Sequence, residues 1–388
     1  MSSSIISKSD RAFIEQAAKE SQRVDGRRLL DHRRVRIHFH VQPGMVEVQL
    51  GTCRVLGVVS AALVVPPAER PAEGIVSLDL LPLPLADSST DANRASETMK
   101  DGRAILQRAI VKSRCVDVES LCVIAGKAVW KVTVELKVLG ERGGEERRGE
   151  WREGRSRRSG GNKQRGVEGG RGRKGEVRLS VNELIMFDTE NGGNVTDCCS
   201  LAAVLSLNHF KLNEVIVDGD KVKVFAYSER IPRSLTLHHI PMCVSFGLFL
   251  LPEKENSSKG DTLVIIADPS KLEEQVMHGQ LVIIAGSKDR SMLYGISKTG
   301  GAPLPPSQLQ RCCEMAIDRA AELHEVCKEA LRKNEEKTKK RDMDALRKIK
   351  RADVEEVEVE EEGESKEKEE KGEEGEAEKE AKKLKTET

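Results

Sequence analysis

The sequence predicts an α+β fold in which strands and helices recur in the order β–α–β–α twice. Apolar residues alternate with period two in several short runs, which is typical of strands. Other apolar residues recur at the three- and four-residue spacing of amphipathic helices. A central stretch without any hydrophobic period separates the two units, and such a stretch cannot bury a core of its own.

The first unit is expected within residues 1–139. Asp10 can cap a helix, which the turn at Asp25 and Gly26 ends. Pro43 and Gly44 lie between two alternating runs, and this arrangement predicts a hairpin. Further strands are expected at 55–65, 121–125 and 129–139, with a helix at 96–112 before the last two.

The second unit is expected within residues 181–335. A strongly apolar run predicts a buried helix at 198–210, and a one-sided apolar pattern predicts a long helix at 306–333. Short apolar runs predict strands at 215–217, 221–225, 243–251, 262–267 and 281–285.

Two charged segments are expected to be disordered: a basic insert at 140–180 and a tail at 336–388 that is first basic and then acidic. The Gly-, Arg- and Glu-rich composition of the insert is compatible with an RNA tether. A tolerated loop insertion, or a purine-rich intron translated by a wrong gene model, explains the same composition more simply.

Two basic clusters at the start of the tail favour two interpretations equally. They form a bipartite nuclear localisation signal, or they are the solvated end of a helix. The residues concerned are Lys339, Lys340, Arg341, Lys348, Lys350 and Arg351.

Composition excludes several classes of protein. The nine cysteines are an odd number and contain no Cys-x-x-Cys pair, so we expect reduced thiols in an intracellular protein. The N-terminal residues lack the basic and apolar regions of a secretory signal. No apolar run is long enough to span a bilayer, so no membrane partner is expected. The formal net charge of zero says nothing about partners.

No motif of a common enzyme class occurs in the sequence. The adjacent residues His238 and His239 are a candidate metal pair, but neighbours on a strand point to opposite faces, which favours packing instead. Glu273 and Glu274 near Asp268 could hold a magnesium ion, although the exposed face of a short turn is the simpler interpretation.

Several segments taken together resemble the RNase PH superfamily, and within it the eukaryotic exosome ring subunits of the polymyositis–scleroderma autoantigen type. The most specific segments are CVDVESLCVIAG and HHIPMCVSF, and the others include SQRVDGRRLLDHRRVRIHF, DCCSLAAVLSLNHF and ADPSKLEEQVMHGQLVI. The resemblance covers roughly residues 8–335 apart from the insert.

This resemblance implies a duplicated β–α fold of the ribosomal protein S5 domain 2-like type, within a hexameric ring that encloses an RNA channel. The implied partners are other RNase PH-like exosome subunits, S1/KH cap subunits and RNA. The implied role is RNA processing and degradation, including rRNA processing, in the nucleus with its nucleolus and in the cytoplasm.

The resemblance also implies that the phosphorolytic site has been lost. Active members hold phosphate with a Gly-Gly-Thr-Arg-type turn, and the matching stretch here begins at Asp197 and contains Cys199 and Ser200 instead. Val111 replaces a family arginine, Asp268 is kept, and Glu274 stands where active members carry aspartate. We therefore expect no catalytic residue, no bound metal and no cofactor, with Asp197 helping to cap its helix while repelling phosphate.

The basic residues that remain are suited to RNA backbone contacts, or they are a solvated helix face. They are Arg108 first, and then Arg103, Lys112 and Arg114. Aromatic residues are few, so base stacking is not expected to drive binding. The alternative functions are an active phosphorolytic 3′-exoribonuclease and a free RNA-binding protein that acts through the basic insert.

Overall fold

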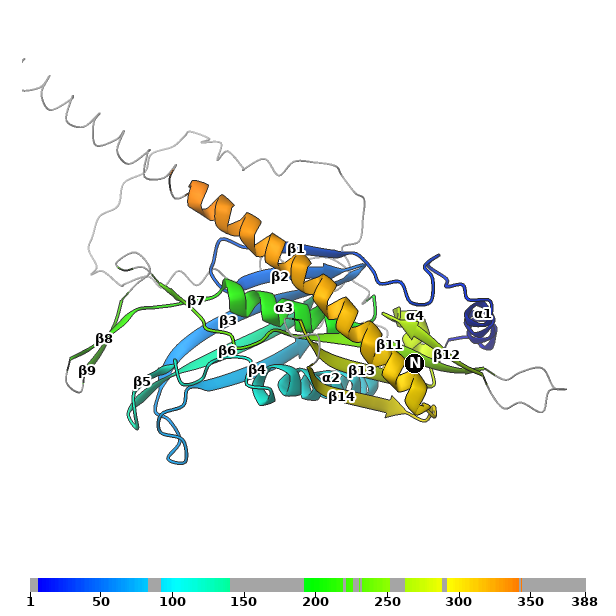
Figure 1. Ribbon diagram of the computed structural model, residues 1–388, viewed down its shortest axis with the longest axis horizontal. Helices are drawn as coiled ribbons and strands as arrows, with labels where there is room; N and C mark the ends of the chain where they lie inside the picture. Colours follow the sequence, from blue (N-terminus) through cyan, green and yellow to red (C-terminus); the bar gives the residue numbers. More distant parts are fainter. Residues whose placement is uncertain are drawn as a thin grey trace, which may run out of the picture. The chain divides into compact units, whose positions relative to one another are not determined.

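A computed structural model describes the fold (Figure 1). It describes residues 6–82, 92–139, 192–218, 221–225, 230, 232–251, 262–287, 292–341 and 343. The chain divides into two compact units, Met1–Glu325 and Val326–Thr388. The insert expected at 140–180 and the acidic part of the tail lie outside the described residues.

The first sheet contains six strands, and its hairpin confirms the alternating pattern in the sequence. Its order is β1-β2-β3-β6-β4, with β5 paired to β6. The strands are β1 (Val35–Phe39), β2 (Met45–Leu50), β3 (Cys53–Val64), β4 (Ile75–Pro82), β5 (Cys122–Ile124) and β6 (Ala128–Leu139). Every second residue of β2 is buried, as expected of a strand with one face on the core.

A helical crossover joins β4 to β6, which are the parallel neighbours in this sheet. It begins with α2 (Ala92–Gln107) and continues as the π-helical turn η1 (Arg108–Lys112), so the helix ends at the residue that the sequence predicts. A π-helical turn is rare and frequently marks a functional site.

The second sheet contains four antiparallel strands in the order β12-β11-β13-β14. They are β11 (Pro241–Leu251), β12 (Thr262–Ala267), β13 (Gly279–Gly286) and β14 (Leu293–Gly300), with the short helix α4 (Lys271–Val276) between β12 and β13. Two small ribbons accompany them: β7 (Lys211–Leu212) with β10 (Arg233–Ser234), and β8 (Val215–Asp218) with β9 (Lys221–Val224).

The helix α3 (Val195–His209) lies between the two sheets (Figure 1). It contacts β2, β3 and β6 of the first sheet and β11 of the second. Every residue from Asp197 to Leu207 is buried, because the helix is covered on both sides. A helix covered in this way carries apolar residues all round, which explains the strongly apolar run in the sequence.

A long C-terminal helix at 306–341 extends past the boundary at 335 that the sequence predicts. Within the first unit, its residues Cys312 and Ala316 form one core cluster with Val244, Phe246 and Ile283 of the second sheet. None of the helices in the described part is long and apolar enough to cross a membrane.

The N-terminal helix α1 (Lys8–Lys19) packs on the second half of the chain. Ser7 caps this helix, because its side chain accepts a hydrogen bond from the Asp10 amide. The predicted cap, Asp10, lies in the first turn of the helix instead. Ile14 and Ala18 pack against Phe249 of β11 and other residues of that half. We call residues 6–33, which include this helix, the N-terminal segment.

Candidate functional site

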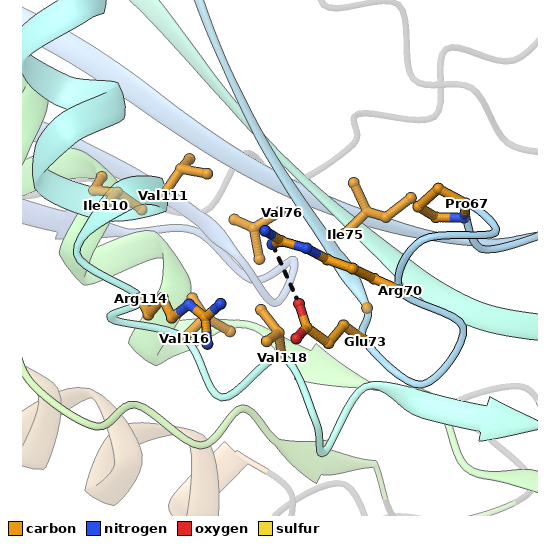
Figure 2. Close-up of a pocket in the computed structure, with 11 residues that line it drawn as sticks. Pro67, Arg70, Glu73, Ile75, Val76, Ile110, Val111, Arg114, Val116 and Val118 are labelled. Atoms are coloured by element: carbon orange, nitrogen blue, oxygen red, sulfur yellow. Dashed lines mark hydrogen bonds and ion pairs between the residues drawn. The ribbon is translucent and has the colours of Figure 1, made fainter. Parts of the chain in front are cut away.

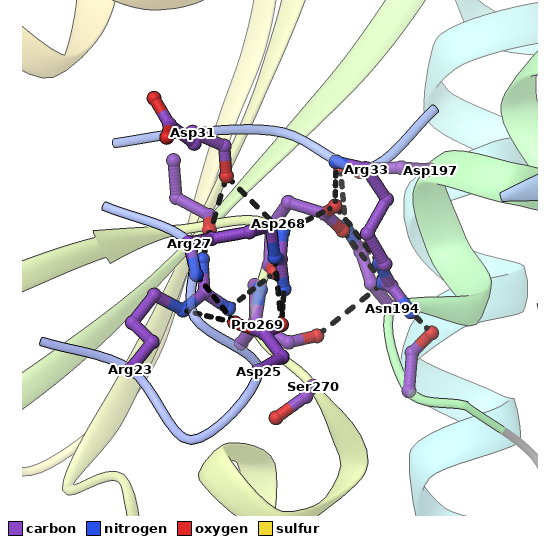
Figure 3. A network of polar contacts seen from close by, with 12 residues as sticks. Arg23, Asp25, Arg27, Asp31, Arg33, Asn194, Asp197, Asp268, Pro269 and Ser270 are labelled. Atoms are coloured by element: carbon purple, nitrogen blue, oxygen red, sulfur yellow. Dashed lines mark hydrogen bonds and ion pairs between the residues drawn. The ribbon is translucent and has the colours of Figure 1, made fainter. Parts of the chain in front are cut away.

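The most densely connected polar cluster surrounds Asp268, the residue after β12 (Figure 3). Its backbone is left-handed, with φ of 49°, a conformation uncommon for residues other than glycine. Its side chain is 1% exposed. The carboxylate therefore needs partners inside the protein.

Arginines of the N-terminal segment supply most of these partners. Arg33 forms a two-pronged contact, with Nε 2.9 Å from Oδ2 of Asp268 and Nη2 2.6 Å from Oδ1. The Arg33 backbone amide donates to Oδ2 as well, at 2.9 Å. Arg27 adds a hydrogen bond from Nη1 to Oδ2 at 3.1 Å. Such bidentate arginine–carboxylate contacts are among the strongest hydrogen bonds in proteins.

These contacts keep Asp268 ionised. Burial acts to raise its pKa, but the hydrogen bonds and the charge of Arg33, together with Asn194, outweigh burial and lower the pKa well below its usual range. The pKa of Arg33 is raised in return, since contact with Asp268 outweighs its own burial. The pair is therefore a fixed internal ion pair.

A second buried ion pair lies beside the first and corrects a prediction. Arg23 donates to both carboxylate oxygens of Glu273, at 2.8 Å and 2.5 Å, and also to the Ala267 and Asp268 carbonyl oxygens. Glu273 is 2% exposed. The expectation that Glu273 and Glu274 form an exposed turn face is wrong, because Arg23 provides the charge that allows Glu273 to be buried.

Asn194 connects Asp268 to two further carboxyl groups. Its Nδ2 lies 2.6 Å from Oδ1 of Asp268 and 2.7 Å from Oδ2 of Asp197, and its backbone amide donates to Glu274 at 2.7 Å. Ser245 donates to Asp197 from both its amide and its hydroxyl. Asp197 is therefore held toward β11 and does not cap α3, contrary to expectation.

Burial dominates the ionisation of these two carboxyl groups. It raises the pKa of Asp197 to about 7 against the lowering effect of the Ser245 and Asn194 hydrogen bonds. It raises the pKa of Glu274 to about 7 against the hydrogen bond from Asn194 and the charge of Arg33.

The carboxyl cluster does not fit a divalent cation. Magnesium binds carboxylate oxygens that are free to face it. Both oxygens of Asp268 already accept several hydrogen bonds from Arg27, Arg33 and Asn194. Within the described residues, no group of three metal-ligating side chains has a suitable arrangement.

The remaining positions of the expected phosphate site are not gathered around an open pocket. Ser200 is buried in α3 and accepts a hydrogen bond from the Cys243 amide. Cys199 is fully buried, and burial raises its thiol pKa well above the usual range. Val111 lies in η1 instead, where it lines a pocket. Asp268 and Glu274 thus lie together, as expected, while Val111 belongs to a different surface.

That pocket has a volume of about 240 Å³ and an apolar floor with charged groups at its edge (Figure 2). Ile110, Val111 and Val116 contribute to the floor. Arg114 and the ion pair between Arg70 and Glu73 supply the charges.

All four predicted RNA contacts are exposed on α2, η1 and the turn after them. Arg103 forms an ion pair with Asp79 of β4, with 2.6 Å between Arg103 Nη2 and Asp79 Oδ1. Arg108, Lys112 and Arg114 form no ion pair with another described residue. The exposed cations therefore cluster at the end of the crossover helix.

A stacked aromatic pair beside these cations was not predicted. The rings of His239 and Tyr294 are 4.2 Å apart between centroids and nearly parallel, at 14°. His239 Nε2 lies 3.1 Å from Ser113 Oγ. His238 points elsewhere and lies 3.8 Å from Asp117, so the two histidines do not converge on one ion.

The three arginines and Asn194 of the carboxyl cluster were not predicted from the sequence. The run SQRVDGRRLLDHRR is dense in arginine, the residue that is preferred for buried ion pairs with carboxylates. Its partners lie 235 to 250 residues away, so no local pattern could identify them.

The predicted basic clusters of the tail are only partly described. Lys339, Lys340 and Arg341 are exposed at the end of the C-terminal helix. Lys348, Lys350 and Arg351 lie outside the described residues.

Comparisons with known proteins agree with the fold and its two halves. The model of the 3′ exoribonuclease family, domain 1, matches residues 31–213, and that of domain 2 matches residues 239–319. Exosome complex component RRP45 of Danio rerio is 32% identical over 86% of this chain and 69% of the relative. The human protein of that name is also 32% identical, but the chain spans only 62% of its length.

A more distant relative and a solved structure extend the comparison. Exosome complex component rrp45 of Schizosaccharomyces pombe is 27% identical over 83% of this chain and 89% of the relative. A chain of the Archaeoglobus fulgidus exosome with RNA bound to its active site has a TM-score of 0.56. It is 18% identical, with 82% of this chain and 97% of that chain covered, and it shares the fold.

Proposed function

The chain belongs to the 3′ exoribonuclease family, and from this premise we propose that it is a non-catalytic ring subunit of an RNA exosome. In this role it contributes to ring assembly and to RNA contacts during 3′-to-5′ RNA processing and degradation. The relatives that are named exosome complex components support the assignment, because each is similar over more than four fifths of this chain.

The observation that carries the non-catalytic part is the state of Asp268. Phosphorolysis brings two anions together, so an active site needs free cations for phosphate and free carboxylates for a metal or a proton. Here Arg27 and Arg33 both form ion pairs with Asp268 itself. The buried Cys199 and Ser200 offer no cation at the start of α3. The cluster joins the two halves of the chain, and the charges of Arg33 and Asp268 compensate each other within the protein.

The exposed cations support the RNA contact. Arg108 and Lys112 lie on η1 and Arg114 lies in the turn after it, and none of them forms an ion pair with another described residue, so each can neutralise an RNA phosphate. Phosphate contacts of this kind bind RNA without reading its sequence. The affinity should therefore fall steeply as salt increases.

Partners and location complete the proposal. Other RNase PH-like subunits form the ring with this chain, S1/KH subunits cap it, and RNA passes through it. The protein acts in the nucleus, including the nucleolus, and in the cytoplasm. The exposed cluster of Lys339, Lys340 and Arg341 supports nuclear import.

Affinity purification of the tagged chain from its cells tests the assembly. Mass spectrometry should recover the other RNase PH-like subunits and the cap subunits together with it. Recovery of the chain alone, or with unrelated RNA-binding proteins, would contradict the ring assignment and favour a free RNA-binding protein.

A Glu274→Gln variant tests the absence of catalysis. Glutamine keeps an acceptor for the Asn194 amide but cannot transfer a proton. In a reconstituted ring, phosphate-dependent RNA shortening should proceed at the same rate with either chain. A loss of a hundredfold or more, as expected for a lost acid–base group, would show that this site is active.

A further inference from the structure

We propose that the stacked rings of His239 and Tyr294 form a platform for one base of single-stranded RNA, beside the phosphate-binding cations Arg108 and Lys112. This inference rests on the proposed RNA contact and specifies it further. The two rings come from distant parts of the chain, the segment before β11 and the strand β14.

The geometry of the pair is that of a preformed stacking surface. The rings are nearly parallel, and both are partly exposed. Ser113, in the turn after η1, contacts the histidine ring and fixes its orientation. Burial, with the charge of His238, lowers the pKa of His239, so its ring stacks in the neutral form. A platform that is already ordered loses little entropy when a base stacks on it.

Three departures from regular backbone meet at this place. The cations extend from the π-helical turn η1, and Arg114 has a left-handed backbone with φ of 57°. In the pairing of β13 with β14, Ile284 faces Gly295 and Ala285 faces Leu293, so the register shifts at Tyr294 and the strand forms a bulge there. Such a bulge redirects a side chain, and π-helical turns and bulges both occur often at functional sites.

The cations lie close enough to serve the same ligand. A Cβ placed on Gly295 would come within 3.0 Å of Arg108 Cδ, so the arginine crosses the backbone next to Tyr294. Lys112 and Arg114 flank Ser113 in the chain, and Ser113 contacts His239. Asp117 is the nearby anion, and His238 lies 3.8 Å from it. Aromatic rings with adjacent cations are the chemistry that binds single-stranded nucleic acid.

A reconstituted ring that contains the full chain tests the platform with a short oligouridine probe. The variant Tyr294→Leu removes the ring and keeps an apolar side chain. It should weaken binding about fivefold to tenfold, as expected for the loss of one base stack. It should leave the salt dependence unchanged, because no phosphate contact is lost. Tyr294→Phe should bind normally, and so should Phe13→Leu, which removes an exposed aromatic ring on α1.

The variant Arg108→Gln distinguishes a failure of the platform from a failure of the proposed RNA contact. It should reduce both the affinity and the salt dependence, since it removes a phosphate contact. If Arg108→Gln weakens binding and Tyr294→Leu does not, the platform is overturned while the RNA contact stands. If neither has an effect, the RNA contact itself fails. If Tyr294→Leu prevents ring assembly, the aromatic pair is a subunit contact and the proposal is overturned.

Discussion

Single residues join the two halves of the chain, and the contact between Arg33 and Asp268 is one of two buried ion pairs that do so. Removing one partner of a buried ion pair leaves the other charge without compensation, which costs about 3–5 kcal/mol. We expect Arg33→Gln to lower the free energy of unfolding by about 3 kcal/mol, measured by urea denaturation.

The matched control is Arg36→Gln, an exposed arginine on β1. It should change stability by less than about 0.5 kcal/mol. The double variant Arg33→Gln with Asp268→Asn should recover part of the loss, because it removes the uncompensated charge as well. Equal stability of the Arg33→Gln and Arg36→Gln variants would contradict a structural role for the ion pair.

Asp197 gives the protein a pH dependence of the opposite sign to that of Asp268. Its pKa rises from 3.8 in the unfolded chain to about 7 in the folded protein. The folded state therefore binds more protons between these values, and stability is lost as the pH rises through this range. Asp268, whose folded pKa is lowered, contributes stability that is lost only as the pH falls into the acidic range.

An Asp197→Asn variant should abolish the Asp197 part of this dependence. Asparagine can accept from the Ser245 amide and donate to its hydroxyl, without a charge to bury. Relative to the natural chain, the variant should gain about 1–3 kcal/mol between pH 4.5 and pH 8. Thermal unfolding at both pH values measures this gain, and a pH-independent difference would contradict it.

The sequence predicted part of this residue-level picture. The proximity of Asp268 to Glu274 was predicted because six residues separate them and the segment resembles a known family. The arginines were missed because a buried ion pair joins residues that are adjacent only in space. The left-handed backbone of Asn194 and Asp268 is only weakly signalled by residue type, because Asn and Asp are enriched in this conformation but most of them do not adopt it.

Among the elements, the turn before α3 is the one that the carboxyl cluster depends on. Gly193 has a φ of 81°, and a Cβ there would lie 2.3 Å from the Lys271 amide nitrogen. Both the backbone conformation and the space require glycine. We expect Gly193→Ala to destabilise the protein by more than about 3 kcal/mol, which thermal unfolding would detect.

Gly126 provides a matched control with a similar φ of 77° and no atom within 4 Å of an added Cβ. Gly126→Ala carries the cost of the left-handed backbone alone, about 1 kcal/mol. If the two variants were equally stable, close packing at Gly193 would not be the cause of its effect.

Helices and strands with a strong hydrophobic period were predicted from the sequence. Strands that are stabilised mainly by pairing with a neighbouring strand were not predicted. The hairpin of β1 and β2 and the buried helix α3 follow directly from hydrophobic period. No strand was predicted where β4 and β14 lie. β4 ends in a proline-containing run that argues against a strand, and β14 is a glycine- and lysine-containing edge strand. β4 forms as a strand because it pairs with β6, and β14 forms because it pairs with β13.

At the scale of the whole molecule, the insert joins two ends that lie close together. Leu139 at the end of β6 pairs with Arg54 of β3. Gly192, where the described chain resumes, lies against Thr52 and Cys53 of the same strand region. A short connection can therefore bridge this gap, since the cost of loop closure changes slowly with length.

A chain without residues 141–178 should consequently fold and assemble like the full chain. Size-exclusion chromatography of the reconstituted complex, with and without the deletion, measures this directly. Failure of the shortened chain to join the ring would show that the insert takes part in assembly.

The docking of the N-terminal segment onto the second half also sets the order of events during synthesis. Arg23 leaves the ribosome 250 residues before Glu273, its partner. At roughly 5–20 residues per second, α1 and the arginines wait for about ten seconds or more before their binding surface exists. The N-terminal segment thus docks only after most of the chain that follows it has been synthesised. A product that terminates before α4 exposes Arg23 and Arg33 at its beginning, and this distinguishes it from a complete subunit.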